Sequence, residues 1–522
     1  MWWKLRCAVA WVRQARRSER SPPAHRPSDS AAVGSATHVP VTDGVPLKLQ
    51  PGPGEYRCEW HVPALDGQFV TLQGDLELQV DHPPRASAWG EGVPVEWTYS
   101  NGSKGAGFPQ TRVYETLRGK LLDGRDVILI DVQMSIWDPE RAILFPRAAL
   151  IGQRLRDNEQ LAFDGLKIQI TGSDAVAGIG PLKSFTFPAT NQEHLAGSWT
   201  VEGQPASTQQ WSDDRAELRM EYDGAFSIGD PFFYRMAFSP TIILTLTEPA
   251  SFDECLRQWV QPLQRILSLA TGRREQITYL VMSLICDDRR AHERRCQVYG
   301  LGLHQAPFAS RNDEVLHAKP AFRIAGDGLS LLDMVRQWQK LTDEHHPLLE
   351  TYGSSIVTPE QHPRSRYLLL IQALEGLYGY ETRAAFDRRD KAHAARRAQV
   401  LAAVEVSLHR EARRFLKDYL MKRPPASLDT SLRELFMALP IDVTPMLADT
   451  ALVKIMGQDP RRPQDVASSL RLVRNDLSHG TKGYSAFDIH EVADILDRVA
   501  RAHLMRLLGC TEGTQQRALQ PK

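Results

Sequence analysis

The sequence lacks an excess of charge, long apolar runs and clustered cysteines. Its 522 residues carry 63 Lys and Arg against 63 Asp and Glu, so no overall field draws the molecule toward nucleic acid. No segment reaches the roughly 18 consecutive apolar residues of a membrane-spanning helix. The six cysteines show no repeated spacing, which argues against a disulfide-rich secreted scaffold. These features predict a cytoplasmic protein that does not enter a membrane.

Motifs of several common enzyme classes are also missing. There is no GxxxxGK[ST] phosphate loop and no GxSxG nucleophile elbow, so neither P-loop nor serine-hydrolase chemistry is indicated. The nearest approach to a metal site is the group Cys286, Asp287, His292 and Cys296, which lacks the paired cysteines of a structural zinc site. Buried thiols are the simpler interpretation, and we expect no metal and no other cofactor.

Residues 1–53 are predicted to form a disordered tail. The apolar run Cys7–Val12 is shorter than the roughly 7–15 residues of a signal-peptide core, and Arg13 follows at once. From Ser18 to Pro53 the chain is rich in Ser, Pro, Ala and Gly, and such a segment buries too little apolar surface to fold.

Periodicity predicts an α+β multidomain protein whose first folded part, residues 54–250, is β-rich. Apolar residues alternate along Val70–Val80, as in half-buried strands. Asp123-Gly124 stands between two apolar runs and predicts a hairpin. A sandwich or an irregular barrel fits this pattern, and no catalytic residue types gather in it at a recognisable spacing.

The period changes at Ser251, where Ser251 and Glu254 form a capping box that opens a helix. Residues 251–358 are expected to form a small α/β connector, residues 359–510 an all-α bundle, and residues 511–522 a tail. The bundle is predicted from five helices with short connections. These helices are Arg366–Tyr380, Lys391–Met421, Ser427–Ala438, Gln464–His479 and Phe487–Leu508.

The positive charge that the whole chain lacks is concentrated in residues 361–425, with 14 Lys and Arg against 7 Asp and Glu. Arg396 and Arg397 lie in this segment, and Lys482 lies in the later part of the bundle. We expect these three side chains to contact RNA phosphates. The alternative is that the basic segment is an ordinary solvated helix surface.

The segment Arg474-Asn-Asp-Leu-Ser-His479-Gly480 carries the chemistry in this bundle. Arg474 lies at the edge of a predicted apolar stripe, where a guanidinium loses water and needs an anionic partner. Gly480 predicts the helix end, so His479 falls in the last turn, where the helix dipole favours imidazolium. The spacing alone does not distinguish this segment, because an Arg followed by a His five positions later occurs four times in the chain. The pairs are Arg20/His25, Arg388/His393, Arg474/His479 and Arg498/His503.

Five residues along an ideal helix place Arg474 and His479 about 140° apart. From an undistorted helix, the two side chains cannot reach the same phosphate. Either the last turn unwinds, or two copies of the segment face each other across a dimer and form a cleft suited to RNA cleavage. Glu375 is a second candidate because Ile371 and Tyr378 flank it on an apolar helix face. Its carboxylate needs a cation, and Arg474 can serve. A bridge between them that only holds the bundle together is an equal alternative.

The sequence RNDLSHG, following an amphipathic helix, resembles the signature of the HEPN superfamily. The likeness is greatest to its ApeA-like group, whose first bundle helix carries an "ALE" segment, here Gln372-Ala-Leu-Glu375. The stretch from Ser251 to Arg273 is similar to the joining region of that group. The resemblance extends over residues 50–510 and implies a β-rich N-terminal region joined to a C-terminal HEPN bundle.

The resemblance implies a metal-independent endoribonuclease that acts as a homodimer in anti-phage abortive infection. Arg474 and His479 match the catalytic pair, and Asn475 matches the polar second position. His479 would act as general acid or base, and Arg474 would stabilise the transition state. The β-rich region would be a sensor that binds a phage-derived trigger. Two alternatives stay open: a bundle that binds RNA or nucleotide without cutting, and a dimerising adaptor.

Overall fold

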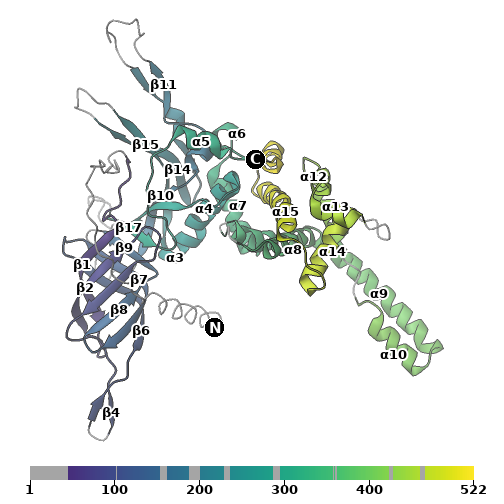
Figure 1. The fold of residues 1–522 in the computed structure, drawn as a ribbon, viewed down its shortest axis with the longest axis horizontal. Helices are drawn as coiled ribbons and strands as arrows, with labels where there is room; N and C mark the ends of the chain where they lie inside the picture. The colour runs from purple at the N-terminus through teal and green to yellow at the C-terminus, as the bar shows by residue number, and fades with distance from the viewer. Residues whose placement is uncertain are drawn as a thin grey trace, which may run out of the picture. The chain divides into compact units, whose positions relative to one another are not determined.

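The structure is a computed structural model, and its ribbon is shown in Figure 1. Residues 1–44, and with them the pair Arg20/His25, lie outside the described residues. So do Cys286, Asp287 and His292 of the metal group weighed above. The structure describes residues 45–100, 103–152, 161–186, 200–227, 235–285, 294–356, 358, 361–422, 427–458 and 465–521.

Six antiparallel strands close into a barrel at the lower left of Figure 1, in the order β7, β6, β1, β2, β3, β8 and back to β7. They are β1 (Gly54–Pro63), β2 (Phe69–Leu78), β3 (Arg85–Trp89), β6 (Gln110–Leu121), β7 (Asp126–Asp138) and β8 (Arg141–Phe145). The hairpin predicted at Asp123-Gly124 is confirmed between β6 and β7. Gly124 has φ 89°, a conformation that favours glycine.

The barrel interior is built around Trp60, which is fully buried. Its indole Nε1 donates to the Ser87 carbonyl at 2.9 Å, so the polar end of the ring is satisfied. Glycine is required beside it, because a Cβ added at either Gly74 or Gly119 would lie 2.4 Å from the ring. Close packing around one large side chain therefore explains two glycines within β-strands.

From β7 the sheet continues as an open antiparallel sheet, in the order β9, β17, β16, β10, β15, β14, β13. These strands are β9 (Ala148–Gly152), β10 (Ala162–Ile170), β13 (Gln209–Ser212), β14 (Ala216–Phe226), β15 (Met236–Ser251), β16 (Ile277–Leu284) and β17 (Arg294–Gly300). Strands β16 and β17 come from the predicted connector, yet they lie in the middle of this sheet. Two small hairpins stand apart, β4 (Thr98–Ser100) with β5 (Ser103–Gly105) and β11 (Leu182–Thr186) with β12 (Thr200–Gly203).

The capping box at Ser251 is confirmed. The Glu254 carboxylate accepts the Ser251 amide at 2.9 Å, and Ser251 Oγ accepts the Glu254 amide at 3.4 Å. The helix that follows consists of α3 (Phe252–Cys255), a π-helical turn η2 (Leu256–Val260) and α4 (Gln261–Thr271), and ends at Gly272 with φ 64°. The remaining helices of this part are α2 (Ser173–Ala177), α5 (Asn312–Ala318), α6 (Ile324–Asp327), α7 (Leu331–Asp343) and the π turn η3 (Leu349–Gly353).

The C-terminal part is helical, as predicted. Its helices are α8 (Pro363–Glu381), α9 (Arg383–Ser407), α10 (Arg410–Tyr419), α11 (Leu428–Met437), α12 (Thr444–Ala448), α13 (Ala451–Gly457), α14 (Val466–His479), α15 (Ala486–Leu507) and α16 (Glu512–Leu519). The prediction of one helix over Lys391–Met421 is wrong. The backbone is extended at Leu408, and α10 folds back along α9, so each helix covers part of the other.

Two predicted tails are partly wrong. Residues 511–522 contain α16, whose Ala518 and Leu519 are buried against the bundle. Within the predicted tail 1–53, Leu47 is buried, and the Tyr299 hydroxyl donates to the Pro51 carbonyl. A few apolar anchors thus order segments whose average composition predicts disorder.

One hydrophobic core runs from the open sheet into the helical bundle. It joins Leu166 of the sheet, Leu263 and Trp338 of the covering helices, and Leu374 and Leu470 of the bundle. A second core fills the barrel. Residues 44–522 form one compact unit, so packing does not separate the predicted connector from the bundle. Among the described residues, no helix has the length and apolar character needed to cross a membrane.

Candidate functional site

Helix α14 carries the Arg474–His479 segment and is fixed at both ends. At its start, the Asp465 carboxylate accepts the Ser468 amide at 2.9 Å and an Arg433 hydrogen bond at 2.6 Å. That arginine lowers the pKa of Asp465 to about 2. The predicted apolar stripe is buried, and it consists of Val466, Leu470, Val473 and Leu477. Gly480 ends the helix with φ 68°, as expected.

The last turn of α14 is tied down by residues that follow it. Tyr484 donates to one Asp476 carboxylate oxygen at 2.6 Å, and Thr481 donates to the other at 2.8 Å. The Tyr484 hydrogen bond holds the pKa of the Asp476 carboxyl below its ordinary value. From α8, Arg364 donates to the Leu477 carbonyl. The turn therefore stays helical, and sequence reasoning missed these three tethers because each depends on a loop or a distant helix.

Arg474 contacts Glu375, the partner expected for it. The closest guanidinium and carboxylate atoms are 3.4 Å apart, and the two side chains are 37% and 45% exposed. Arg474 also donates to the Asn475 side-chain oxygen at 3.2 Å. Glu375 and Asn475 therefore orient a guanidinium that still reaches solvent, which suits contact with a phosphate.

His479 is exposed at the end of α14, and Lys482 follows it with its ammonium 5.1 Å from the centre of the Tyr484 ring. Because α14 remains a regular helix to its end, His479 and Arg474 project from different sides of it. Unwinding of the last turn, one of the two arrangements considered above, does not occur in this structure. Within one chain of this structure, the two side chains therefore do not converge on one point.

The other described Arg/His pairs lack an exposed histidine at a helix end. His503 is fully buried in the bundle core, and burial lowers its pKa to about 4. His393 lies midway along α9, and its Nε2 is 2.9 Å from the Met421 carbonyl. Of the pairs within the described residues, Arg474/His479 combines an exposed histidine at a helix end with a partly exposed arginine.

Buried His503 predicts an acid-sensitive bundle. Its folded-state pKa lies below the ordinary 6.5, so the unfolded chain binds more protons between these values, and stability falls as pH falls from about 6.5 to about 4. Going from pH 7 to pH 5 should cost wild type about 2 kcal/mol more than His503→Leu. Urea unfolding at both pH values measures this, with exposed His490→Leu as the control. Equal losses in wild type and His503→Leu would contradict the prediction.

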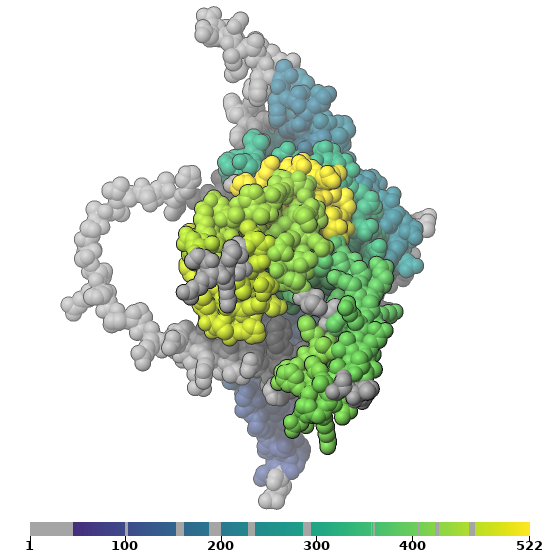
Figure 2. Space-filling model, turned by 90° about the vertical axis from the view of Figure 1, so that its right-hand side faces the viewer, coloured from purple at the N-terminus to yellow at the C-terminus, as the bar shows by residue number. Residues whose placement is uncertain are grey.

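The predicted RNA contacts at Arg396 and Arg397 lie on the arm, defined here as α9 and α10, which projects from the bundle (Figures 1 and 2). Arg396 is exposed, whereas Arg397 donates to the Lys417 and Leu420 carbonyls at 3.0 and 3.4 Å. Arg397 therefore holds the arm together. Of the three predicted contacts, Lys482 is the one beside His479.

The arm also presents a pair of aromatic side chains that sequence reasoning missed. Phe415 and Tyr419 stack with their centroids 4.5 Å apart and are 59% and 73% exposed. They lie four residues apart, with Arg414 and Lys417 on the same short helix. This spacing could have been recognised in the sequence, because aromatic side chains interspersed with basic ones are typical of proteins that bind single-stranded nucleic acid.

The cysteines in the part of the chain that the structure covers are all buried thiols. Cys58, Cys255, Cys296 and Cys510 are free and buried. Burial raises the pKa of Cys296 to about 12, and its thiol lies 3.4 Å from the Met282 carbonyl. Among the described residues, no three His, Cys, Asp or Glu side chains are placed to hold a metal ion.

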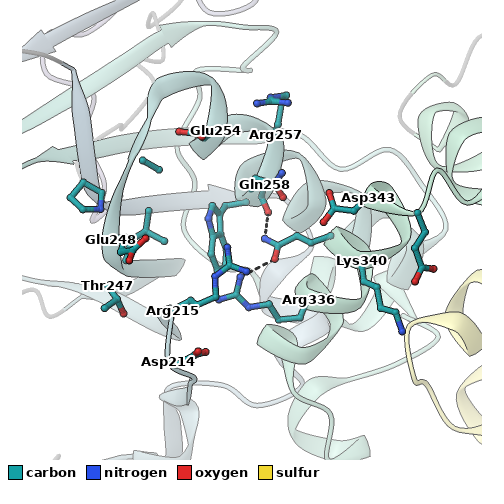
Figure 3. A pocket seen from close by; sticks show the side chains of 16 residues that line it. Asp214, Arg215, Thr247, Glu248, Glu254, Arg257, Gln258, Arg336, Lys340 and Asp343 are labelled. Atoms are coloured by element: carbon teal, nitrogen blue, oxygen red, sulfur yellow. Dashed lines mark hydrogen bonds between the residues drawn. The ribbon is translucent and has the colours of Figure 1, made fainter.

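A cavity of about 930 Å³ lies between the sheet and α7 (Figure 3). Arg336 stacks over Trp259 at 4.7 Å and binds both Asp213 oxygens at 2.7 and 3.0 Å. In Figure 3, Glu248 of the sheet and Lys340 of α7 lie on opposite sides of Arg336. Cations and carboxylates are mixed along the lining.

Residues 89–338 match the family model described as ApeA N-terminal domain 1. The match runs from the end of β3 into α7, and so includes the whole open sheet and the helices that cover it as far as Trp338 of α7. It ends before α8 and does not reach the Arg474–His479 segment. No curated protein and no solved structure shows a match to the chain.

Proposed function

Because this chain is an ApeA-like protein, we propose that it is an anti-phage effector whose helical bundle is a metal-independent endoribonuclease. One observation carries the proposal. His479 stands exposed at the end of a regular helix, and Arg474 on the same helix is oriented by Glu375 yet open to solvent. A histidine and an arginine so placed supply the proton transfer and the positive charge that RNA cleavage needs.

In the proposed reaction, the RNA 2′-hydroxyl attacks its own phosphate. His479 takes the 2′-hydroxyl proton or delivers a proton to the departing 5′-oxygen. Arg474 stabilises the charge on the phosphoryl oxygens. The products are a 2′,3′-cyclic phosphate and a 5′-hydroxyl, and no metal is required to balance the reaction.

The active cleft is proposed to form between two copies of the bundle. An intact α14 keeps Arg474 and His479 of one chain on different sides, so a partner supplies the missing group. An exposed aromatic ring that follows the segment closely in the sequence supports this arrangement. Phe487, at the start of α15, is 78% exposed, and such rings are typical anchors of protein interfaces.

Incubating the purified full chain with total RNA in EDTA tests the proposal directly. Sequencing of 5′-hydroxyl ends should reveal new cleavage sites, and the same ends should appear in bacteria after phage challenge. RNA binding without new ends would instead support a bundle that binds without cutting. Neither binding nor cleavage would favour a dimerising adaptor in which Arg474 and Glu375 only stabilise the bundle.

Substituting Phe487 by Asp should disrupt the proposed dimer. A charge placed at an interface core is left unpaired, so we expect dimer affinity and cleavage to fall at least tenfold. Sedimentation at several concentrations measures the first effect. Leu316→Asp is a matched control, because Leu316 is 62% exposed on α5, within the ApeA-matched region. A Phe487→Asp variant that dimerises like the control would place the interface elsewhere.

A further inference from the structure

A cavity of about 700 Å³ lies at the seam between the ApeA-matched region and the helical bundle. One wall is formed by Gly272 at the end of α4 and by residues 319–327. The other wall is formed by α8, α15, the end of α16 and the two residues that follow it. We call this cavity the seam pocket. Its size is in the range typical of small-molecule sites.

Positive charge dominates the lining of the seam pocket. Six cations face three carboxylates, and they come from segments far apart in the sequence. The cations are Lys319, Arg323, Arg366, Arg498, Arg501 and Arg517, and the carboxylates are Asp327, Asp494 and Asp497. Such a concentration of cations lowers the energy of an anion placed among them.

Three of the arginines already have structural partners. Arg366 bridges to Asp494 and Asp497 of α15. Arg517 binds both carboxylate oxygens of Asp327 at 2.6 Å. Arg501 caps the end of α4 through two carbonyls. All three carboxylates of the lining are thus occupied by these contacts.

The remaining cations are Lys319, Arg323 and Arg498. Within the described ranges, no carboxylate lies at ion-pair distance from any of them. Arg498 donates to two backbone carbonyls, of Asp494 at 3.2 Å and Leu519 at 3.3 Å. Partial burial lowers its pKa, the nearby carboxylates of Asp494 and Asp497 oppose that shift, and a guanidinium stays charged at neutral pH. Both carboxylates also pair with Arg366, so a further anion beside Arg498 would be favourable.

We propose that the seam pocket binds a small phosphate-bearing molecule of nucleotide size, held by Arg498 together with Lys319 and Arg323. Guanidinium groups fit phosphate oxygens through paired hydrogen bonds, and three cations without carboxylate partners suit a ligand with more than one phosphate charge. The lining has no aromatic side chain on which successive bases could stack, which favours a small ligand over an RNA strand.

Such a ligand would join two parts of the molecule. Lys319 and Arg323 belong to the ApeA-matched region, whereas Arg498 belongs to α15 of the bundle. A phosphate bound between them neutralises charges from both walls and ties the walls together. Binding of this ligand does not depend on RNA cleavage, so the two can be tested separately.

Calorimetric titration of the full chain with pyrophosphate, ATP and adenosine tests the proposal. Pyrophosphate or ATP should bind, and Arg323→Gln/Arg498→Gln should weaken that binding at least tenfold. Lys120→Gln/Arg141→Gln, at two exposed positions in β6 and β8 of the barrel, removes the same charge and should leave binding unchanged.

Two results would overturn the seam pocket as a phosphate site. One is the absence of pyrophosphate and ATP binding to wild type, or binding of adenosine with equal strength. The other is equal loss of binding in the two double variants, which would indicate attraction by net charge alone. Lys319→Gln/Arg323→Gln, at two exposed positions, gives the same comparison if the Arg498 variant unfolds.

Discussion

Replacing His479 by Ala is expected to reduce RNA cleavage by about 100- to 10,000-fold while leaving the fold intact. His479 is exposed after the last buried residue of α14, Leu477, so its removal creates no cavity in the bundle. What is lost is the proton transfer at the 2′-hydroxyl or the 5′-oxygen. Initial rates of 5′-hydroxyl end formation measure the loss, and circular dichroism verifies the fold.

The matched control for this prediction is His345→Ala. His345 is 82% exposed between α7 and η3, with its Nδ1 2.9 Å from a Glu350 oxygen. It is a surface histidine with a carboxylate partner, and it lies outside the bundle helices. Cleavage by His345→Ala should stay within twofold of wild type. A His479→Ala rate equally close to wild type would remove His479 from the chemistry.

Substituting Arg501 by Met is expected to lower the free energy of unfolding by about 3 kcal/mol. Arg501 is 4% exposed and donates to the Leu269 and Ala270 carbonyls at 2.5 Å each. These carbonyls belong to the last turn of α4, where helical partners are missing. Met keeps much of the side-chain packing but removes the donor to the Leu269 carbonyl, whereas the Ala270 carbonyl keeps the Ala321 amide at 2.7 Å. Removing a buried charge offsets part of the loss.

Urea unfolding measures the Arg501 effect, and Arg506→Met is its control. Arg506 is on the same helix but is 37% exposed and pairs with Glu381, so its loss should cost less than about 1 kcal/mol. Similar stability of the two variants would mean that the end of α4 finds other donors. A large Arg501 effect would identify this residue as a principal tie between the ApeA-matched region and the bundle.

The distribution of charge in the molecule shows how a chain of zero net charge can present local positive surfaces. Positive side chains gather on the arm and in the seam pocket, while carboxylates elsewhere balance them. Lys482 adds a charge beside His479. A field confined to local surfaces attracts phosphate groups to particular places without drawing the whole protein onto nucleic acid.

The turns, caps and helix ends of this protein could be predicted from the sequence because they depend on local interactions. The hairpin at Asp123-Gly124, the capping box of Ser251 and Glu254, and the end of α14 at Gly480 are all where short-range patterns predict them. Each depends on hydrogen bonds and backbone angles within a few residues, which the sequence states directly. The contact of Glu375 with Arg474 could be predicted because both residues lie at the edge of apolar helix faces.

Long-range packing decided the rest. Position along the chain does not distinguish His479 from His503, yet the bundle buries one and exposes the other. Only the tertiary structure places β16 and β17 in the middle of the sheet, folds α10 back on α9, and brings Lys319 and Arg498 to one cavity. These outcomes depend on contacts between residues tens to hundreds of positions apart, whose strength comes from buried area and paired charge rather than from any local pattern.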